Sequence, residues 1–325
     1  MRGGSPGRDS EAMDLTIRPA VPDDAPMVCR LLNAVDLIEI GREETDLVSV
    51  QADLTHPEAA LAENSWLALR DGEPVGYGLL WDDSGAERID MDQYVLPDHQ
   101  DVADRLFELM EAQAVRRAGA NGAERAVVHL HLHARPTVDT ALLLRRGWSA
   151  VRRHHVLTRP LDPAADRVPV LPDGLALRAC HTEEDRRRAH ALLQESFAEH
   201  YDHQPRSYER WLGDLGELID WSLVWLVSLD GRGDAAAAVT SNHREAHGWI
   251  NNLGVRAEFR GRGIAGLLLR HAFGVYAELG RDTIGLGVDT DNATGALRLY
   301  EGHGMGVHYA VDTWEVALPV PAAAP

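Results

Sequence analysis

The sequence predicts an α+β fold made of two similar halves, each a mixed, mostly antiparallel sheet flanked by helices. Two observations lead to this prediction. Strand-like and helix-like runs occur in groups and do not alternate strictly, which is typical of α+β folds rather than of parallel α/β sheets. The same series of runs also occurs twice, in the same order.

Three pairs of landmarks carry the repeat. Each half has an aspartate–glycine hairpin turn, then a strand end, then a late glycine. The paired positions lie 159, 160 and 157 residues apart: Asp71 and Asp230, Val95 and Val255, Gly147 and Gly304. Asp-Gly between apolar runs is a strong hairpin signal. The near-constant offset is typical of an internal duplication.

The elements follow one order in both halves. A short strand leads to a helix with an acidic first turn, which complements the helix dipole. A second helix-like stretch, the hairpin, a further strand, a long helix, a short strand, another helix and a last strand complete each half. The clearest paired segments are Leu15 to Pro19 with Leu175 to Arg178, and Val102 to Ala118 with Gly263 to Leu279.

The expected domain boundaries follow from this repeat. We expect a disordered lead-in at 1–14, an N-terminal domain at 15–159 and a C-terminal domain at 174–318, followed by a loose tail at 319–325. The segment 160–173 contains four prolines, so it is the expected linker.

The composition limits the kinds of partner. The 325 residues are 45% hydrophobic and carry a formal net charge of −19. Such a chain is unsuited to nucleic acid or an anionic membrane, whose phosphates attract Lys and Arg. The charge favours a cationic substrate, although an acidic surface also serves solubility alone. No run approaches the roughly 18 apolar residues of a membrane span, and Cys29 and Cys180 cannot form a disulfide framework, so we expect a cytoplasmic protein.

The most informative motif is the turn Arg260-Gly261-Arg262-Gly263-Ile264-Ala265 between a strand-like and a helix-like run. Glycines at a helix start leave backbone N–H groups bare at the positive end of the helix dipole, which predicts a phosphate site. Gly261, Gly263 and Gly266, with Asp289 downstream, also match the dinucleotide fingerprint. That fingerprint starts directly after its strand, whereas five residues intervene after Val255 here, so the dinucleotide interpretation is disfavoured.

The turn and the residues after it resemble the GNAT N-acetyltransferase superfamily. The diphosphate loop of that family has Arg or Gln, two residues, Gly, one residue, and Gly or Ala; Arg260, Gly263 and Ala265 occupy these places. The family then has an asparagine and a helix bearing a tyrosine, which correspond to Asn292 and Tyr300. The resemblance covers about 175–318 well and, through the duplication, the first half weakly. It implies two tandem GNAT-like domains, as in mycothiol synthases.

The resemblance also implies a co-substrate and its contacts. Acetyl-CoA would bind between splayed strands, and Gly254 would mark a bulge or a close approach of the ligand arm. Tyr300 would protonate the leaving thiolate as general acid, since a phenol pKa of about 10 suits a thiol of about 8.5. No metal is expected. The expected contacts are Leu253, Gly254, Val255, Arg260, Gly261, Arg262, Gly263, Ile264, Ala265, Asn292 and Tyr300.

The general base is left open by the sequence. Many relatives carry a glutamate on the strand before the loop, but this strand has Trp249 and two asparagines instead. Asn251 or Asn252 can position a water but cannot take a proton at neutral pH. The candidate bases are His243, Glu245 and His200, with His247, Glu195, Asp202 and His203 nearby and a water chain as the alternative.

The first half lacks the expected machinery. In the repeat, Gly261 and Ile264 correspond to the carboxylates Asp101 and Asp104, and Tyr300 corresponds to Leu143. We therefore expect this half to be degenerate. His129, His131 and His133 alternate along one strand, which is either a polar face or a metal-ligand set, and the polar face is favoured.

The sequence therefore predicts an acyl-CoA-dependent N-acyltransferase. We expect it to transfer acetyl directly, in a ternary complex, to a primary amine of a small molecule. The alternatives are a non-enzymatic acyl-CoA-binding or regulatory module and, more specifically, a mycothiol synthase. The acceptor, the acyl length and the oligomeric state are not determined by the sequence.

Overall fold

The computed structural model describes residues 14–82, 84–201, 203–216, 219–243, 247–291 and 295–321. The chain forms two compact units. Unit 1 consists of Met1–Val151 together with Asp312–Pro325, and unit 2 consists of Arg152–Val311. Each unit combines a mostly antiparallel sheet with helices, which confirms the predicted α+β class.

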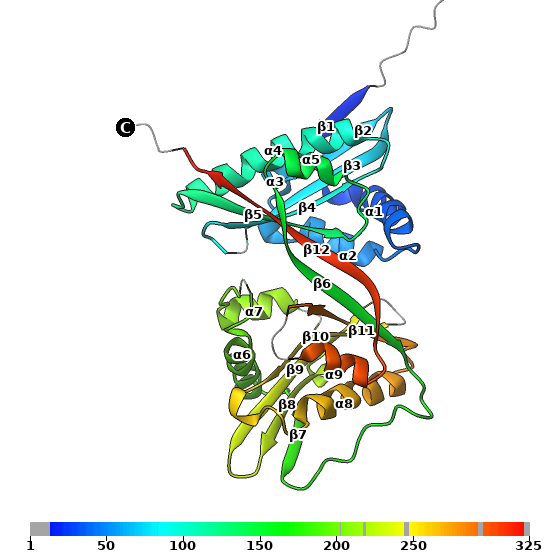
Figure 1. The fold of residues 1–325 in the computed structure, drawn as a ribbon, viewed down its shortest axis with the longest axis vertical. Helices are drawn as coiled ribbons and strands as arrows, with labels where there is room; N and C mark the ends of the chain where they lie inside the picture. The colour runs from blue at the N-terminus through cyan, green and yellow to red at the C-terminus, as the bar shows by residue number, and fades with distance from the viewer. Residues whose placement is uncertain are drawn as a thin grey trace, which may run out of the picture. The chain divides into compact units, whose positions relative to one another are not determined.

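Unit 1 is a sheet with a long helix packed on it (Figure 1). Its strand order is β1 (Leu15–Arg18), β2 (Ser65–Arg70), β3 (Glu73–Trp81), β4 (Arg88–Val95), β5 (Arg125–His133) and β12 (Gly306–Pro319). Its helices are α1 (Ala25–Glu39), α2 (Leu47–Thr55), α3 (Leu61–Asn64), α4 (Gln100–Ala120) and α5 (Thr140–Arg145). Helix α4 buries Leu106, Phe107 and Met110 against β3, β4 and β5. This apolar stripe explains why α4 covers the sheet.

Unit 2 repeats the plan. Its strand order is β6 (Ser149–Pro160), β11 (Thr283–Asp289), β10 (His247–Val255), β9 (Gly233–His243), β8 (Val224–Leu229) and β7 (Leu175–Ala179). Its helices are α6 (Glu183–Phe197), α7 (Tyr208–Leu215), α8 (Ile264–Glu278) and α9 (Ala296–Gly302). Helix α8 buries Leu268, Leu269 and Phe273 in the core that Leu286 of β11 shares. The long helix of each half therefore plays the same part in its unit.

The last strand of each sequence half belongs to the sheet of the other half. Strand β6 pairs antiparallel with β11, from Pro160 opposite Thr283 to His154 opposite Asp289, and Leu157 is fully buried in the core of unit 2. The C-terminal part of β12 neighbours β5, and Trp314 is buried in the core of unit 1. The compact units therefore differ from the contiguous domains 15–159 and 174–318 expected from the sequence.

The linker 160–173 crosses unit 2, because β6 and β7 stand at opposite ends of that strand order. It packs against helix α8 at Gly274, where a Cβ would lie only 2.3 Å from the backbone nitrogen of Val168. The Arg159 guanidinium also holds Asp166 at 2.9 Å. The linker is therefore a packed segment of unit 2.

In each unit two parallel strands pair at one end and then diverge. Strands β10 and β11 are in register from His247 opposite Thr283 to Ile250 opposite Leu286, and no further. A bulge on β10 at Asn251 shifts its register with β9 between Ile250 and Asn252. The bulge lies where the divergence begins.

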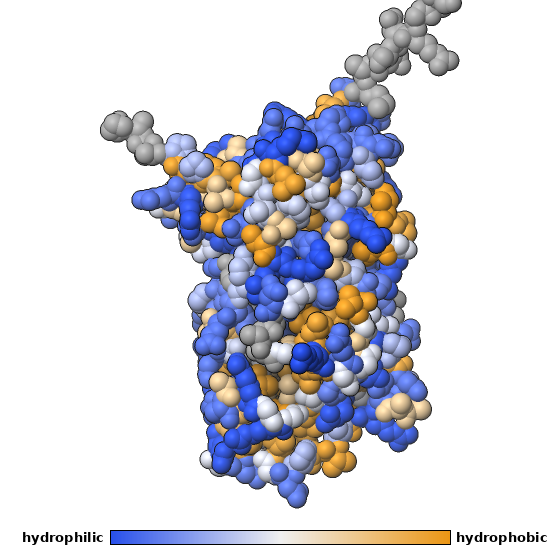
Figure 2. All heavy atoms as spheres, in the orientation of Figure 1, coloured by the Kyte–Doolittle hydropathy of each residue, from blue (hydrophilic) through white to orange (hydrophobic). Residues whose placement is uncertain are grey.

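The ends of the described chain and its surface complete the picture. Most of the expected lead-in and tail lies outside the described residues, but Pro319 ends β12 and the Val320 N–H donates to the Glu124 carbonyl oxygen at 2.9 Å. No helix among the described residues is long and apolar enough to cross a bilayer. Hydrophilic side chains cover most of the face drawn in Figure 2.

Candidate active site

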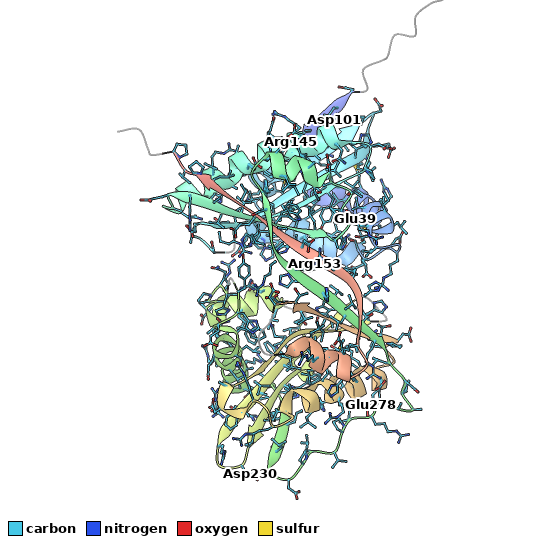
Figure 3. The ribbon with its side chains drawn as sticks, viewed as in Figure 1. Glu39, Asp101, Arg145, Arg153, Asp230 and Glu278 are labelled. Carbon is cyan, nitrogen blue, oxygen red and sulfur yellow. The ribbon has the colours of Figure 1, made fainter. Side chains whose placement is uncertain are left out.

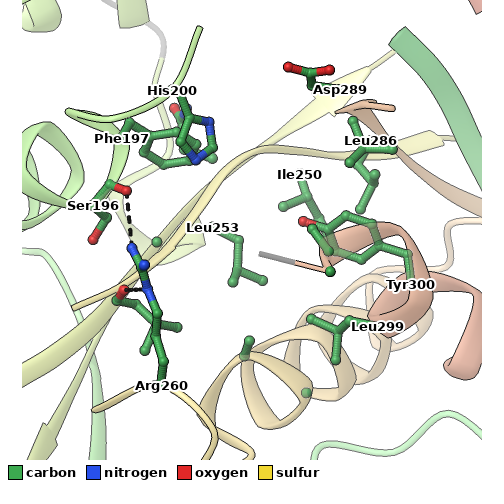
Figure 4. Close-up of a pocket in the computed structure, with 18 of the residues that line it drawn as sticks. Ser196, Phe197, His200, Ile250, Leu253, Arg260, Leu286, Asp289, Leu299 and Tyr300 are labelled. Carbon is green, nitrogen blue, oxygen red and sulfur yellow. Dashed lines mark hydrogen bonds between the residues drawn. The ribbon is translucent and has the colours of Figure 1, made fainter. Parts of the chain in front are cut away.

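A cavity of about 520 Å³ opens in unit 2 where β10 and β11 diverge (Figure 4). Its walls come from β10 and β11, from the end of α6 and the turn after it, from the glycine turn before α8, and from α9. The predicted site residues that line it are Leu253, Gly254, Val255, Arg260, Gly261, Gly263, Ile264, Ala265, Tyr300 and His200. The fold thus brings most of the predicted residues to one place.

The glycine turn has the geometry of an anion site. Gly261 and Gly263 have φ of 74° and 76°, and Gly263 is the N-cap of α8 without a side-chain cap. At the N-terminus of α8, the first helical hydrogen bond runs from the Leu267 N–H to the Gly263 carbonyl oxygen, at 3.0 Å. The N–H groups of the first turn before Leu267 therefore remain as donors at the positive end of the dipole.

Three arginines lie near the turn, and each has different contacts in the structure. Arg260 lines the cavity, and its guanidinium donates to the carbonyl oxygens of Val255 and Ser196, at 3.1 and 3.5 Å (Figure 4). Arg256 pairs with Glu195 at 2.9 Å. Arg262, a predicted contact, does not line the cavity and lies over the Phe259 ring, 5.7 Å from its centre. Arg260 is therefore the arginine that the turn directs to the cavity.

Gly254 of β10 packs against helix α6. A Cβ on Gly254 would lie 2.9 Å from Ser196 Cβ and 3.2 Å from Leu193 Cδ2 of α6. Of the two interpretations of Gly254, the bulge is wrong, because the bulge lies at Asn251. The close approach of a ligand arm stays a prediction, and Gly254 lines the cavity. The missing side chain lets α6 approach β10.

Tyr300 lies in α9 and lines the cavity with only 9% of its surface exposed. Burial raises the pKa of its phenol above the usual value. Among the described residues, none forms a hydrogen bond with its hydroxyl group. The phenol is therefore protonated at neutral pH and faces the space where the two strands separate (Figure 4).

Among the candidate bases whose side chains the structure describes, His200 alone lines the cavity. Its ring packs edge-on against Phe197, with centres 4.6 Å apart. Burial lowers the pKa of His200. Glu195 forms an ion pair with Arg256 at the surface. His247 lies opposite His243 in the register of β10 and β9, at the end of β9 and away from the diverging strands. Asn292, Glu245, Asp202 and the side chain of His243 lie outside the described residues.

The sequence did not identify several cavity residues as part of this site. Asp289 ends β11 and lines the cavity beside His154 of β6 and Tyr201. The Arg152 Nε–H donates to the Asp289 carboxylate at 2.8 Å, and the same guanidinium lies 4.8 Å from the centre of the Tyr201 ring. The position of Asp289 at the carboxyl end of a parallel strand was the available signal.

The corresponding turn of unit 1 is closed by its own side chains. Gln100 donates to the Thr137 carbonyl oxygen and accepts from the Asp139 N–H, at 2.9 and 2.8 Å. Asp101, labelled in Figure 3, pairs with Arg70 at 2.5 Å. Leu143, in the place of Tyr300, is fully buried. The Gln100 amide and the Asp101 carboxylate already have protein partners, so this turn is poorly suited to bind a diphosphate.

The three alternating histidines of β5 have protein partners. His129 bonds the Glu315 carboxylate at 2.8 Å, His131 bonds the Thr313 hydroxyl at 3.1 Å, and His133 bonds Glu39 at 2.5 Å. No cluster of three or more potential metal-ligating side chains occurs in the part of the chain that the structure describes. These contacts favour the polar-face interpretation.

Comparisons with known proteins agree with this architecture. Residues 179–305 match the family model for the acetyltransferase (GNAT) family. A mycothiol acetyltransferase from Nocardiopsis dassonvillei is 27% identical over 270 residues, covering 74% of this chain and 78% of the relative. A GCN5-related N-acetyltransferase from Sphaerobacter thermophilus has a similar structure, with a TM-score of 0.80, 26% identity and coverage of 96% and 98%.

A second solved structure extends the comparison to the whole chain. A tandem GNAT protein from the clavulanic acid biosynthesis pathway superposes with a TM-score of 0.66 at 17% identity, covering 96% of this chain and 100% of that one. This likeness concerns the fold. Residues 179–305, within unit 2, therefore form an acetyltransferase (GNAT) family domain, and the whole chain has a fold of two GNAT-like domains in tandem.

Proposed function

We propose that the protein is an N-acetyltransferase that transfers acetyl from acetyl-CoA to a primary amine of a small molecule, directly, in a ternary complex. One observation carries the proposal: the uncapped glycine turn of α8 and the buried Tyr300 phenol line the same cavity. GNAT enzymes generally use acetyl-CoA, and the residues of this cavity fit such a co-substrate.

The fit rests first on the diphosphate. The first-turn N–H groups of α8 supply donors, and positive φ at Gly261 and Gly263 turns the backbone without side chains in the way. One such helix-end interaction contributes roughly 0.3–1 kcal/mol when exposed and up to about 2 when partly buried. Arg260 adds a full charge in an otherwise acidic chain. Several contacts together give useful affinity.

The gap between the diverging strands suits the pantetheine arm. Backbone groups of β10 beyond Ile250 no longer pair with β11, so they can bond the amides of the arm. The bulge at Asn251 frees backbone groups at the narrow end of the gap. We propose that an N–H of this bulge polarises the thioester carbonyl, where one such donor contributes about 10²–10³ in rate.

Tyr300 is the proposed general acid. The departing thiolate needs a proton, and the raised pKa of the buried phenol keeps that proton available at neutral pH. The apolar neighbours Leu299 and Leu286 line the same cavity and exclude water from this position. Acetyl-CoA supplies the activated acyl group.

The acceptor is proposed as a small amine because the cavity volume is about 520 Å³ and the chain is strongly acidic, with a net charge of −19. A cationic amine is steered favourably by such a field. One relative is named a mycothiol acetyltransferase. The amine of a cysteinyl amino sugar is therefore the specific acceptor to test first. We propose that the reaction takes place in the cytoplasm.

A thiol-release assay tests the proposal. Purified protein is incubated with acetyl-CoA and a panel of amines that includes cysteinyl amino sugars, other amino sugars and simple alkylamines, and free CoA thiol is measured. We expect amine-dependent release with at least one acceptor class. Tight CoA binding without release on any amine would instead support a non-enzymatic acyl-CoA-binding module.

A further inference from the structure

Three separate elements line the cavity with an imidazole, a carboxylate and the proposed acid. His200 follows α6, Asp289 ends β11 and Tyr300 lies in α9, and all three line the cavity (Figure 4). Strand β10, where many relatives carry a glutamate base, offers Asn251 and Asn252 here. The described cavity lining therefore contains two imidazoles, those of His200 and of His154 on β6, beside the acid.

The position of His200 is fixed by its neighbours. Its backbone N–H donates to the Phe197 carbonyl oxygen at 2.9 Å, and its backbone carbonyl oxygen accepts from the backbone N–H of His203 at 3.2 Å. The adjacent Tyr201 ring packs under Arg152, which also holds Asp289 at 2.8 Å. One guanidinium therefore fixes both the turn that bears His200 and the carboxylate at the end of β11.

Unit 1 has an imidazole and a carboxylate in the corresponding place. There the helix supplies the carboxylate and the strand supplies the imidazole, which is the reverse of unit 2. Leu130 and Leu286 are the last paired residues of β5 and β11, so His133 corresponds to Asp289, three residues further on. At the end of α1, Glu39 (Figure 3) bonds His133 at 2.5 Å and also accepts from the Thr137 N–H. In unit 1 an imidazole and a carboxylate thus bond each other directly.

In unit 2 no hydrogen bond between described residues joins His200 to Asp289, and both line the cavity. A small cationic group would meet a carboxylate on one side and an imidazole on the other. This is the environment needed to bind an ammonium and then deprotonate it.

We propose that His200 is the general base that takes the proton from the acceptor ammonium, and that Asp289 stabilises the imidazolium that forms. The proposal rests on the proposed acetyltransferase function and assigns the base within it. Asp289 acts here as a positioning and electrostatic residue, since Arg152 already occupies part of its carboxylate.

The proton and bond changes balance as follows. An N–H bond of the ammonium breaks and the proton moves to a ring nitrogen of His200. The freed lone pair forms the C–N bond to the thioester carbonyl carbon, the C–S bond breaks, and the thiolate takes the proton of Tyr300. The remaining extra proton on the new amide nitrogen returns the phenol to its protonated form. His200 then releases its proton to solvent.

The charges around His200 suit this role. Burial, the largest cause, lowers its pKa, the charge of Asp289 raises it, and Arg260 and His203 lower it. The ring is therefore neutral, and able to accept a proton, at pH 7. Because its pKa lies below the ordinary value of about 6.5, the acidic limb of turnover should lie below that pH.

The test compares His200→Asn with His203→Gln, measuring turnover across pH at saturating substrates and CoA binding by calorimetry. His203 shares the same turn but does not line the cavity. We expect His200→Asn to lose about 100-fold in turnover at pH 7, the lower end of general-base effects. The deficit should shrink at high pH, where the amine loses its proton without help. CoA affinity should stay within about twofold in both variants, and His203→Gln should keep its activity.

A second variant separates a base from a structural role. Asp289→Asn removes the charge that raises the pKa of His200, so the acidic limb should move to lower pH. A loss in His200→Asn that is equal at every pH, or full activity in that variant, would overturn the assignment. If the unaltered protein released no thiol with any amine, the acetyltransferase proposal itself would fail, which is a distinguishable result.

Discussion

Gly254 of β10 and Ser196 of α6 lie so close that a Cβ on the glycine would be 2.9 Å from the serine Cβ. The contact sets the distance between helix and strand at the wall of the cavity. The same serine offers its backbone carbonyl oxygen to Arg260. Packing in this corner therefore positions both the helix end that leads to His200 and the arginine of the glycine turn.

Gly254→Ala should destabilise unit 2 by about 1–3 kcal/mol, because the added methyl group forces α6 away from β10. The matched control is Gly287→Ala on β11, where a Cβ would meet nothing within 4 Å. Chemical denaturation measures both free energies of unfolding. Equal free energies of unfolding in the two variants would show that α6 moves away from β10 without loss of stability.

Gly263→Ala should weaken CoA binding through the backbone alone. The position has room for a side chain but a φ of 76°, which costs a non-glycine residue of order 1–3 kcal/mol. We expect a loss of about tenfold or more in affinity as the turn relaxes. Gly302→Ala in α9, which has neither crowding nor positive φ, is the control and should bind CoA as the unaltered protein does.

Tyr300→Phe should lower turnover by about tenfold or more, since a general acid typically contributes at least that much. Acetyl-CoA affinity should change little, because the phenyl ring still fills the cavity wall. Tyr276→Phe is the control: its hydroxyl donates to the Ser241 carbonyl oxygen at 2.8 Å, and Tyr276 does not line the cavity. Steady-state thiol release decides, and unchanged turnover in Tyr300→Phe would exclude the phenol from the reaction.

The exchange of last strands predicts where distant mutations act. Trp314→Ala should destabilise unit 1 by about 3–5 kcal/mol, and Leu157→Ala should destabilise unit 2 by about 2–5 kcal/mol. Hydrogen exchange resolved by segment should show α4 losing protection in the first variant and α8 in the second. The reverse pattern would contradict the exchange. Val307→Ala, at a half-exposed position, should change neither.

The sequence predicted the fold class, the duplication and the glycine turn because local signals specify them. Positive φ at Gly72, Gly261 and Gly263 follows from residue type and position. The exchange of β6 and β12 was not predictable, since an alternating strand pairs equally well with either sheet. Its cause lies in tertiary packing around Leu157 and Trp314.

The site was predicted in part for the same reason. The turn and Tyr300 carry a spacing that the sequence displays, and they meet in one cavity. The roles of Gly254 and Asp289 depend on which helix or strand lies opposite, which no spacing encodes. His200 could be named as one of several candidates, but only the fold separates it from Glu195, which Arg256 holds at the surface.

Titration calorimetry with coenzyme A tests the central claim most directly, because the account requires a diphosphate at the glycine turn of unit 2 and none at the closed turn of unit 1. We predict one CoA bound per chain, with an affinity about tenfold or more lower in Gly263→Ala and unchanged when Gln100 is replaced by alanine. No uptake of CoA, or two equivalent sites per chain, would contradict the account.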